Sequence, residues 1–189
     1  MADLMNNDVF LAFSTYATIV VLKMMFMAPL TGYFRITRKA FSNWEDTAIG
    51  KKNPEDRKKM LQTNPDVERV RRCHQNDLEN IIPFVVIGLL YAFTGPDLST
   101  ALLHFRVFVG SRFIHTVSYI LALPQPSRGL SWLVGIITTF SVAYGVLTTA
   151  REKPVLYHLL SLLLSFLIKL YVIHNKNLSA CQQYTGIYT

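Results

Sequence analysis

Long apolar blocks constrain this chain more than any other feature. Residues Val9–Leu22, Ile81–Phe93 and Leu130–Leu147 are examples, and they are continuous runs without a helical or strand period. A helix that crosses the hydrocarbon core of a bilayer needs about 20 predominantly apolar residues. A soluble domain of 189 residues, 51% of them hydrophobic and 16% charged, would have to bury every block. The pattern therefore predicts membrane-spanning helices.

The apolar blocks and their turn signals predict an all-α, integral membrane, four-helix up-and-down bundle in residues 1–153. Asn64 is a predicted N-cap, with Pro65 in the first helical turn. A 154–189 extension contains a candidate fifth transmembrane helix, Pro154–His174, for which a helix lying along the lumenal interface is the alternative. Lys51–Lys59 is predicted to be a solvated, mobile loop. The first, third and fourth predicted spans are Asp8–Phe34, Ser99–Leu121 and Gly129–Thr149. The second is the apolar half of the helix that Asn64 caps, which ends at about Phe93.

The net charge of +7 comes mainly from one segment between two spans, Arg35–Arg72. A basic loop between spans is the positive-inside signal, so it predicts a cytosolic loop and a lumenal N-terminus. This placement argues against a nucleic-acid-binding role. Met1–Asp8 lacks the basic region of a cleavable signal peptide, so the first span is expected to be retained.

Cysteine and histidine usage indicates neither a disulfide framework nor a metal site. Cys73 and Cys181 are the only cysteines, and Cys73 follows the basic loop. His74, His104 and His115 lack Cys, Asp or Glu companions at ligand spacing. We expect no metal cofactor.

The first polar group suited to binding is a stripe at the start of the second long helix. At about 100° per residue, Arg69, Arg72, Asn76 and Glu79 fall within an arc of roughly 80°. The alternative is an ordinary charged face with internal pairs such as Arg72 with Glu79. Asp77 lies on a different face and is expected to be structural, as is His74.

The second group is Arg112, His115 and Tyr119, whose spacing places them within about 60° of one another near the cytosolic end of the third span. Arg128 opens the fourth span on the same side of the membrane. Arg106 points elsewhere and is expected to make an internal ion pair, with Glu79 as one candidate partner. The topology brings the two groups and Arg128 together in a pocket suited to an anionic, peptide-like ligand that meets an apolar partner.

Three motifs resemble one known family. Val67–Phe84 (VERVRRCHQNDLENIIPF) resembles the signature of the membrane-associated proteins in eicosanoid and glutathione metabolism. Arg38–Asp46 (RKAFSNWED) and the segment from His104 to Tyr119 fit the same family. Leu123–Ser131 (LPQPSRGLS) is similar to its microsomal glutathione transferase 1 branch. The resemblance extends over about residues 1–149.

The resemblance implies a homotrimer in the endoplasmic reticulum membrane, and also the mitochondrial outer membrane, with glutathione bound between neighbouring subunits as co-substrate. It implies conjugation of glutathione to hydrophobic electrophiles and reduction of lipid hydroperoxides, as in detoxification. Arg128 is the implied catalytic residue. The implied glutathione-binding residues are Arg35, Arg38, Arg72, Asn76, Glu79, Arg112, His115 and Tyr119.

Within this scheme, Arg72 and its neighbouring cations hold the glutathione carboxylates, Glu79 takes the amino group, and Asn76 fixes the peptide backbone. Arg128 stabilises the thiolate. A free thiol has a pKa of about 8.5, and lowering it to about 6.5 requires roughly 2.7 kcal/mol. One guanidinium in a partly desolvated site is sufficient for such a shift.

Particular residues of this chain argue against the alternative functions. The prostaglandin E synthase branch has Ser where this chain has Gly129, which argues against isomerisation. Mammalian members of the transferase branch have a reactive Cys where this chain has Thr47, so activation by thiol modification is not expected; Cys73 is the alternative sensor. A non-catalytic lipid-binding protein like the five-lipoxygenase-activating protein is disfavoured by Arg128. The intramembrane charges of Lys23 and Arg106 could suggest a small transporter or channel. This alternative is disfavoured because no inverted repeat is visible in the sequence.

Overall fold

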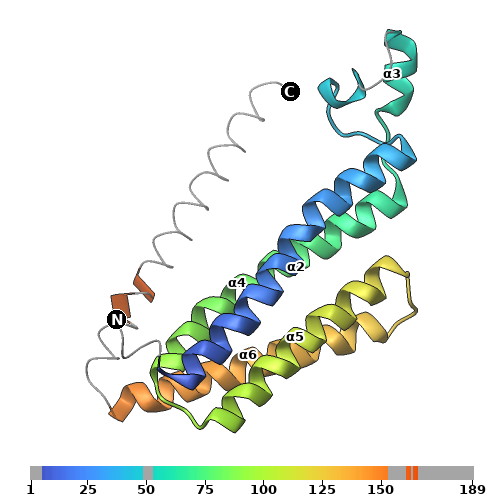
Figure 1. The fold of residues 1–189 in the computed structure, drawn as a ribbon. Helices are drawn as coiled ribbons and strands as arrows, with labels where there is room; N and C mark the ends of the chain where they lie inside the picture. The colour runs from blue at the N-terminus through green and yellow to red at the C-terminus, as the bar shows by residue number, and fades with distance from the viewer. Residues whose placement is uncertain (1–5, 49–52, 153–160, 163, 166–189) are drawn as a thin grey trace, which may run out of the picture. The chain divides into compact units, whose positions relative to one another are not determined.

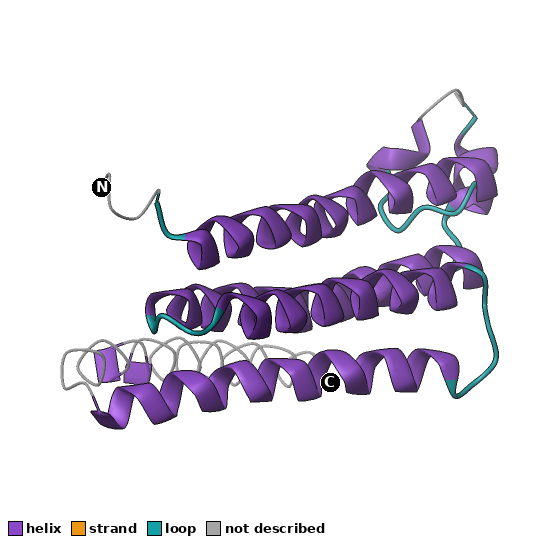
Figure 2. Ribbon diagram, turned by 60° about the horizontal axis from the view of Figure 1, so that its bottom comes forward, coloured by secondary structure: helices purple, strands orange, loops and turns teal. Residues whose placement is uncertain are grey.

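The computed structural model describes residues 6–48, 53–152, 161–162 and 164–165, and all of their regular secondary structure is helical (Figure 2). The chain divides into two compact units, Met1–Tyr144 and Gly145–Thr189. The elements are four long helices, α2 (Asp8–Arg38), α4 (Pro65–Phe93), α5 (Leu98–Ile120) and α6 (Ser127–Glu152), and two short ones, η1 (Glu45–Ala48) and α3 (Pro54–Met60).

Side-chain caps begin the helices α2, α4 and α5, and the cap of α4 is the predicted one. The Asn64 side chain accepts a hydrogen bond from the Asp66 N–H at 2.9 Å, which starts α4 as predicted. Asn7 caps α2 by accepting from the Phe10 N–H. Asp97 caps α5, and hydrogen bonds from the Ser99 hydroxyl and the Thr100 N–H hold the pKa of this exposed carboxyl below its usual value. These caps satisfy backbone donors that a helix start leaves unpaired.

Aromatic side chains form the centre of the first unit, where α2 packs against α4 and α5 and α4 packs against α5. Phe84 and Phe108 stack with ring centroids 3.5 Å apart, and Phe105 meets Phe13 edge to face at 5.7 Å. Gly88 of α4 lies so close to Phe13 that an added Cβ would come within 2.8 Å of the ring. A small residue at this crossing lets the two helices approach closely.

Helix α6 runs beside α5 (Figure 1) and meets it through side chains. His104 of α5 and Ser141 of α6 are hydrogen-bonded at 2.9 Å. The Arg128 guanidinium lies over the Tyr119 ring, 5.0 Å from its centroid. The second contact attaches the first turn of α6 to the end of α5, and the first attaches the second half of α6 to the first half of α5.

Three of the described helices, α2, α4 and α6, are long and apolar enough to cross a membrane. Helix α5 has the length of a span, with 23 residues, but Arg106 and Arg112 lower its hydropathy. Large apolar side chains face outward along the helices; Phe26 is 63% exposed and Phe140 is 70% exposed. Lipid is the environment that accommodates such a surface. The predicted all-α membrane bundle is confirmed in these features.

The prediction that Lys51–Lys59 is a mobile loop is wrong for most of the segment. Residues 54–60 form α3, because Asn53 accepts from the Glu55 N–H and Pro54 occupies the first turn. Arg57 of α3 donates to the Thr47 hydroxyl at 3.1 Å and lies over the Trp44 ring. The charge of this segment suggested a loop, but the Asn53 cap and Pro54 are a local signal for the start of a helix.

The predicted fifth helix, Pro154–His174, lies mostly outside the described residues. Residues 161, 162, 164 and 165, the described positions within it, are helical.

Candidate functional site

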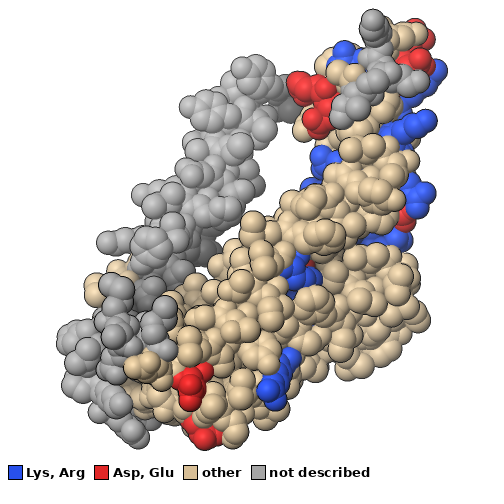
Figure 3. Space-filling view, viewed as in Figure 1, with Lys and Arg blue, Asp and Glu red and all other residues tan. Residues whose placement is uncertain are grey.

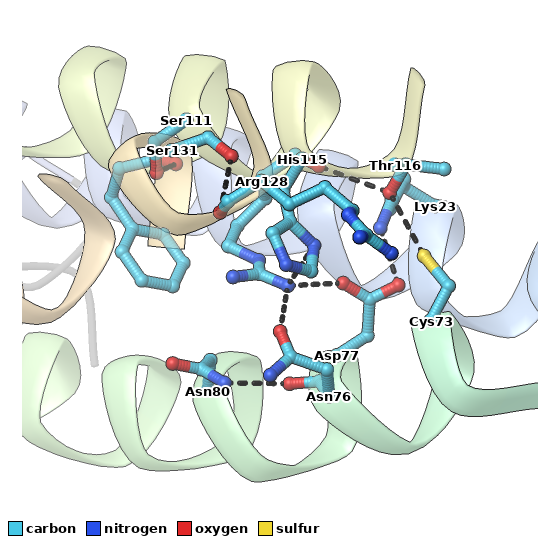
Figure 4. A network of polar contacts seen from close by, with 12 residues as sticks. Lys23, Cys73, Asn76, Asp77, Asn80, Ser111, His115, Thr116, Arg128 and Ser131 are labelled. Atoms are coloured by element: carbon cyan, nitrogen blue, oxygen red, sulfur yellow. Dashed lines mark hydrogen bonds and ion pairs between the residues drawn. The ribbon is translucent and has the colours of Figure 1, made fainter. Parts of the chain in front are cut away.

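A buried charge network joins α2, α4 and α5 in the first unit (Figure 4). Asp77 of α4 accepts from Lys23 of α2 through one carboxylate oxygen and from Arg112 of α5 through the other, the latter at 2.8 Å. The side chains of Asp77 and Arg112 are fully buried, and that of Lys23 is 7% exposed. Two cations and one anion leave this network with an excess of one positive charge. Burying such a charge is costly unless a further anion is bound.

Arg112 is the centre of this network. Its Nη2 donates to the Asn76 side-chain oxygen at 2.7 Å and to Asp77, and it also lies 3.1 Å from His115 Nδ1. A guanidinium has five N–H donors. The three donors on Nε and Nη1 have no hydrogen-bond partner in the described part of the chain. Arg112 therefore retains donors for an anion after its structural contacts are made.

The contact with Arg112 favours one tautomer of His115. Arg112 Nη2 carries two N–H donors, and Asn76 and Asp77 accept them, so the contact with His115 Nδ1 is at most a shared donor. Because a guanidinium has no acceptor, a proton on Nδ1 would oppose this contact, which favours the proton on Nε2 and a neutral His115. In the same way Asn76, whose side-chain oxygen is engaged by Arg112, keeps its NH₂ group as a donor.

Tyr119 and Arg128 extend the cluster toward the start of α6. The Tyr119 ring centroid lies 5.0 Å from that of His115, and the central carbon of the Arg128 guanidinium lies 5.0 Å from the Tyr119 ring centroid. Arg128 Nε is buried and has no partner among the described residues. The structure thus brings together Asn76, Arg112, His115, Tyr119 and Arg128, and the donors left over are suited to anions.

Four other predicted residues make no hydrogen bond or ion pair with this cluster in the described part of the chain. Arg38 pairs with Asp66 at 2.9 Å, and Arg35 has a buried, unpartnered Nε in the last turn of α2. Within the described ranges, exposed Arg72 makes no hydrogen bond or ion pair. Glu79 accepts from Gln75 at 3.1 Å.

Two sequence-based interpretations of ion pairing are wrong. The internal pair of Arg72 with Glu79 does not form, and the stripe instead pairs at i,i+3 through Arg69 with Asp66. Arg106 does not pair with Glu79 but donates from Nε to the Tyr16 hydroxyl at 3.0 Å. Helix angles alone could not find Tyr16, because it belongs to another helix.

Lys23 and Asp77 are members of the network that the predicted site omitted. Asp77 had been assigned to a structural face, which its two ion pairs bear out, but those pairs also hold Arg112. The signal was present in the sequence at Lys23, a lone charge within an apolar span, since intramembrane charges usually pair with an opposite charge.

Cys73 lies beside the network and is fully buried among Met27, Val70 and Tyr119. Its thiol is 3.8 Å from the Thr116 hydroxyl. It has the surroundings of a small core residue rather than those of an accessible sensor.

Basic side chains gather where α2 and α4 approach α3, and most of the remaining described surface in this view is uncharged (Figure 3). Arg38 and Arg71 are exposed members of this group. The asymmetry agrees with the predicted cytosolic side of the bundle.

Comparison with known proteins gives consistent matches over most of the chain. Residues 13–148 match the model of the MAPEG family. Microsomal glutathione S-transferase 1 of Sus scrofa is 57% identical over 148 residues, which cover 78% of this chain and 94% of the relative. The Homo sapiens protein of the same name is 55% identical with the same coverage. Prostaglandin E synthase of Homo sapiens is 37% identical, also over 78% of this chain and 94% of the relative.

Proposed function

The chain belongs to the MAPEG family, the membrane-associated proteins in eicosanoid and glutathione metabolism, and from this premise we propose that it is a membrane-bound glutathione transferase. It conjugates glutathione to hydrophobic electrophiles and reduces lipid hydroperoxides with glutathione. Family membership confirms the resemblance inferred from Val67–Phe84. Identity of 55–57% to the transferases, against 36–37% to the prostaglandin E synthases, favours the transferase activity over the isomerase.

The observation that carries the proposal is the set of unpartnered donors in the buried cluster. Arg112 Nε and Nη1 and Arg128 Nε are buried without partners in the described residues. Glutathione is an anionic tripeptide, so its carboxylates and thiolate are the acceptors that such donors require. A binding site for a neutral lipid would not concentrate guanidinium groups in this way, which argues against a purely lipid-binding role.

In the proposed mechanism Arg128 stabilises the glutathione thiolate. Its stacking on Tyr119 holds the guanidinium in one orientation at the start of α6. Arg112, Asn76 and neutral His115 donate to the polar groups of the tripeptide. A preorganised donor that acts on developing negative charge in a partly dry site is worth about 100- to 1,000-fold in rate.

Arg35, Arg38, Arg72 and Glu79 complete the proposed site from a neighbouring copy. In the described residues, none of the four makes a hydrogen bond or ion pair with the cluster of its own chain. A homotrimer that binds glutathione between subunits places one subunit's cluster against the next subunit's basic end. The proposed catalytic domain is residues 1–153, and the proposed location is the endoplasmic reticulum membrane, with the mitochondrial outer membrane as a second site.

Turnover and thiolate formation test the role of Arg128. Purified protein in detergent is assayed for conjugation of an uncharged aromatic electrophile, and the ultraviolet absorbance of the thiolate is followed on glutathione binding. We expect Arg128→Ala to lower turnover about 100-fold or more and to abolish the thiolate signal while glutathione still binds. Arg57→Ala is the matched control, because Arg57 also lies over an aromatic ring, Trp44, at 4.2 Å. Unchanged turnover in Arg128→Ala would refute the assignment.

Equilibrium binding tests the contribution of Arg72. Arg72→Ala is expected to weaken glutathione binding, whereas Arg71→Ala, which removes an equally exposed cation paired with Glu68, is expected to leave it unchanged. Equal affinities for the two variants and the parent would remove Arg72 from the site.

A further inference from the structure

A groove of about 520 Å³ runs between α5 and α6. Val107 and Ile114 of α5 and Leu130 and Val134 of α6 line it, and all four side chains are exposed. An exposed apolar groove on two spanning helices is a natural site for a hydrocarbon chain.

The hydroxyl groups in the groove are already engaged by their own helices. Ser111 donates to the Phe108 carbonyl at 2.7 Å, and Ser131 donates to the Ser127 carbonyl at 2.9 Å. These hydroxyl groups therefore have no hydrogen left to donate to an occupant of the groove. The polar group that remains to face an occupant is the guanidinium of Arg106.

Arg106 has a neutral partner and no acidic one. Its Nε donates to the Tyr16 hydroxyl, and its terminal nitrogens make no hydrogen bond within the described residues. The two acids nearest the middle of α4 already have partners. Asp77 makes ion pairs with Lys23 and Arg112, and Glu79 accepts a hydrogen bond from Gln75. A cation at this depth is costly without an anion.

The groove lies on the side of α5 that faces away from Arg112. At about 100° per residue, Arg106, Gly110 and Ile114 lie on one side of α5, and Arg112 and Tyr119 lie on the other. A ligand whose carboxylate is on Arg106 would therefore not contact Arg112, whereas the far end of the groove, at Ser127 and Ser131, adjoins the turn of α6 that carries Arg128.

We infer that the groove between α5 and α6 binds a medium-chain monocarboxylate, with its carboxylate on Arg106 and its hydrocarbon chain along the apolar wall toward Ser127. A guanidinium pairs with a carboxylate through two parallel N–H donors, which suits the terminal nitrogens that Arg106 leaves unengaged. The occupant would bridge α5 and α6.

Depth and length select the class of ligand. Arg106 lies eight residues after Leu98, about 12 Å along the helix, and therefore near the middle of a hydrocarbon core of about 30 Å. A phospholipid phosphate stays at the interface and does not reach this depth, whereas a carboxylic acid can enter as the neutral acid. Arg106 to Ile114 is again about 12 Å. An extended hydrocarbon chain with bonds of about 1.52 Å advances roughly 1.3 Å per carbon along its axis. A length of about 12 Å therefore matches about nine carbons.

Binding of decanoate and decanol to the purified full-length protein in neutral detergent tests the inference, because neither compound reacts with glutathione. We expect saturable decanoate binding by calorimetry, at least ten-fold tighter than decanol binding, with a rise in Tm. Arg106→Gln should bring the two affinities together, and Arg106→Lys should restore part of the difference. Equal binding of decanoate and decanol to the parent protein would overturn the proposal.

A second variant tests the groove without altering Arg106. Gly110 lines the groove, and an added Cβ there meets no atom within 4 Å, so Gly110→Leu starts its side chain in open space and directs bulk into the groove. It should abolish decanoate binding. Gly32→Leu on α2, where an added Cβ also meets nothing within 4 Å, is the matched control and should bind normally. Normal decanoate binding in Gly110→Leu would show that decanoate binds outside the groove and would overturn the proposal. Conjugation activity, measured in parallel, reports on the proposed function independently.

Discussion

Neutralising Asp77 should destabilise the bundle more than the loss of any exposed ion pair. Asp77→Asn keeps the shape of the side chain but leaves Lys23 and Arg112 facing each other without an anion. The side chains of Asp77 and Arg112 are fully buried, and that of Lys23 is 7% exposed. Removing one partner of a buried pair costs about 3–5 kcal/mol. In a chain of this size that corresponds to a fall in Tm on the order of 10 °C.

Removing the charge of Lys23 as well should recover part of the stability that Asp77→Asn loses. In the double variant Lys23→Met, Asp77→Asn, one cation and one anion are deleted, so the network keeps the same net charge as before. Contacting residues couple by about 0.5–3 kcal/mol, and we expect the double variant to be more stable than Asp77→Asn by an amount within that range.

Thermal unfolding in a fixed detergent, with and without glutathione, measures these effects. The control is Asp56→Asn, which breaks an exposed pair with Lys59 at 3.4 Å and should cost at most about 1 kcal/mol. A stability for Asp77→Asn equal to that of the control would refute the reasoning. So would a double variant that is less stable than Asp77→Asn, because it would show that Lys23 does not depend on the acid.

Three further outcomes follow from packing and chain order. N-ethylmaleimide should activate the enzyme little, because Thr47 offers no thiol and Cys73 is fully buried; strong activation that disappears in Cys73→Ser would contradict this. Gly88→Ala should destabilise by about 1–3 kcal/mol in denaturant unfolding, because the new Cβ would come within 2.8 Å of Phe13, and a neutral effect would show that the ring moves freely. Truncation after Lys153 should preserve conjugation, since every residue proposed to act precedes it, and loss of activity would show that the extension supports the bundle.

The sequence alone determined the class of the fold and the start of α4. Bilayer-length apolar blocks allow few structures other than spanning helices, because an unsatisfied backbone in lipid is so unfavourable. Asn64 followed by Pro65 is a local signal, and the helix begins there as predicted. Local signals of this kind depend on neighbours within one turn, so they can be predicted without the fold. The same kind of signal at Asn53 was overlooked, and α3 was predicted to be a loop.

Partners across helices were decided by the tertiary structure. Helical spacing placed Arg112 and His115 on one face, but it could not show that Asp77 and Asn76, on different faces by angle, both reach the same Arg112 nitrogen. Nor could it pair Arg106 with Tyr16. A periodicity gives the direction of a side chain relative to its own axis. Which residue it meets depends on the separation and rotation of a second helix, and packing of aromatic and small residues between helices sets those quantities.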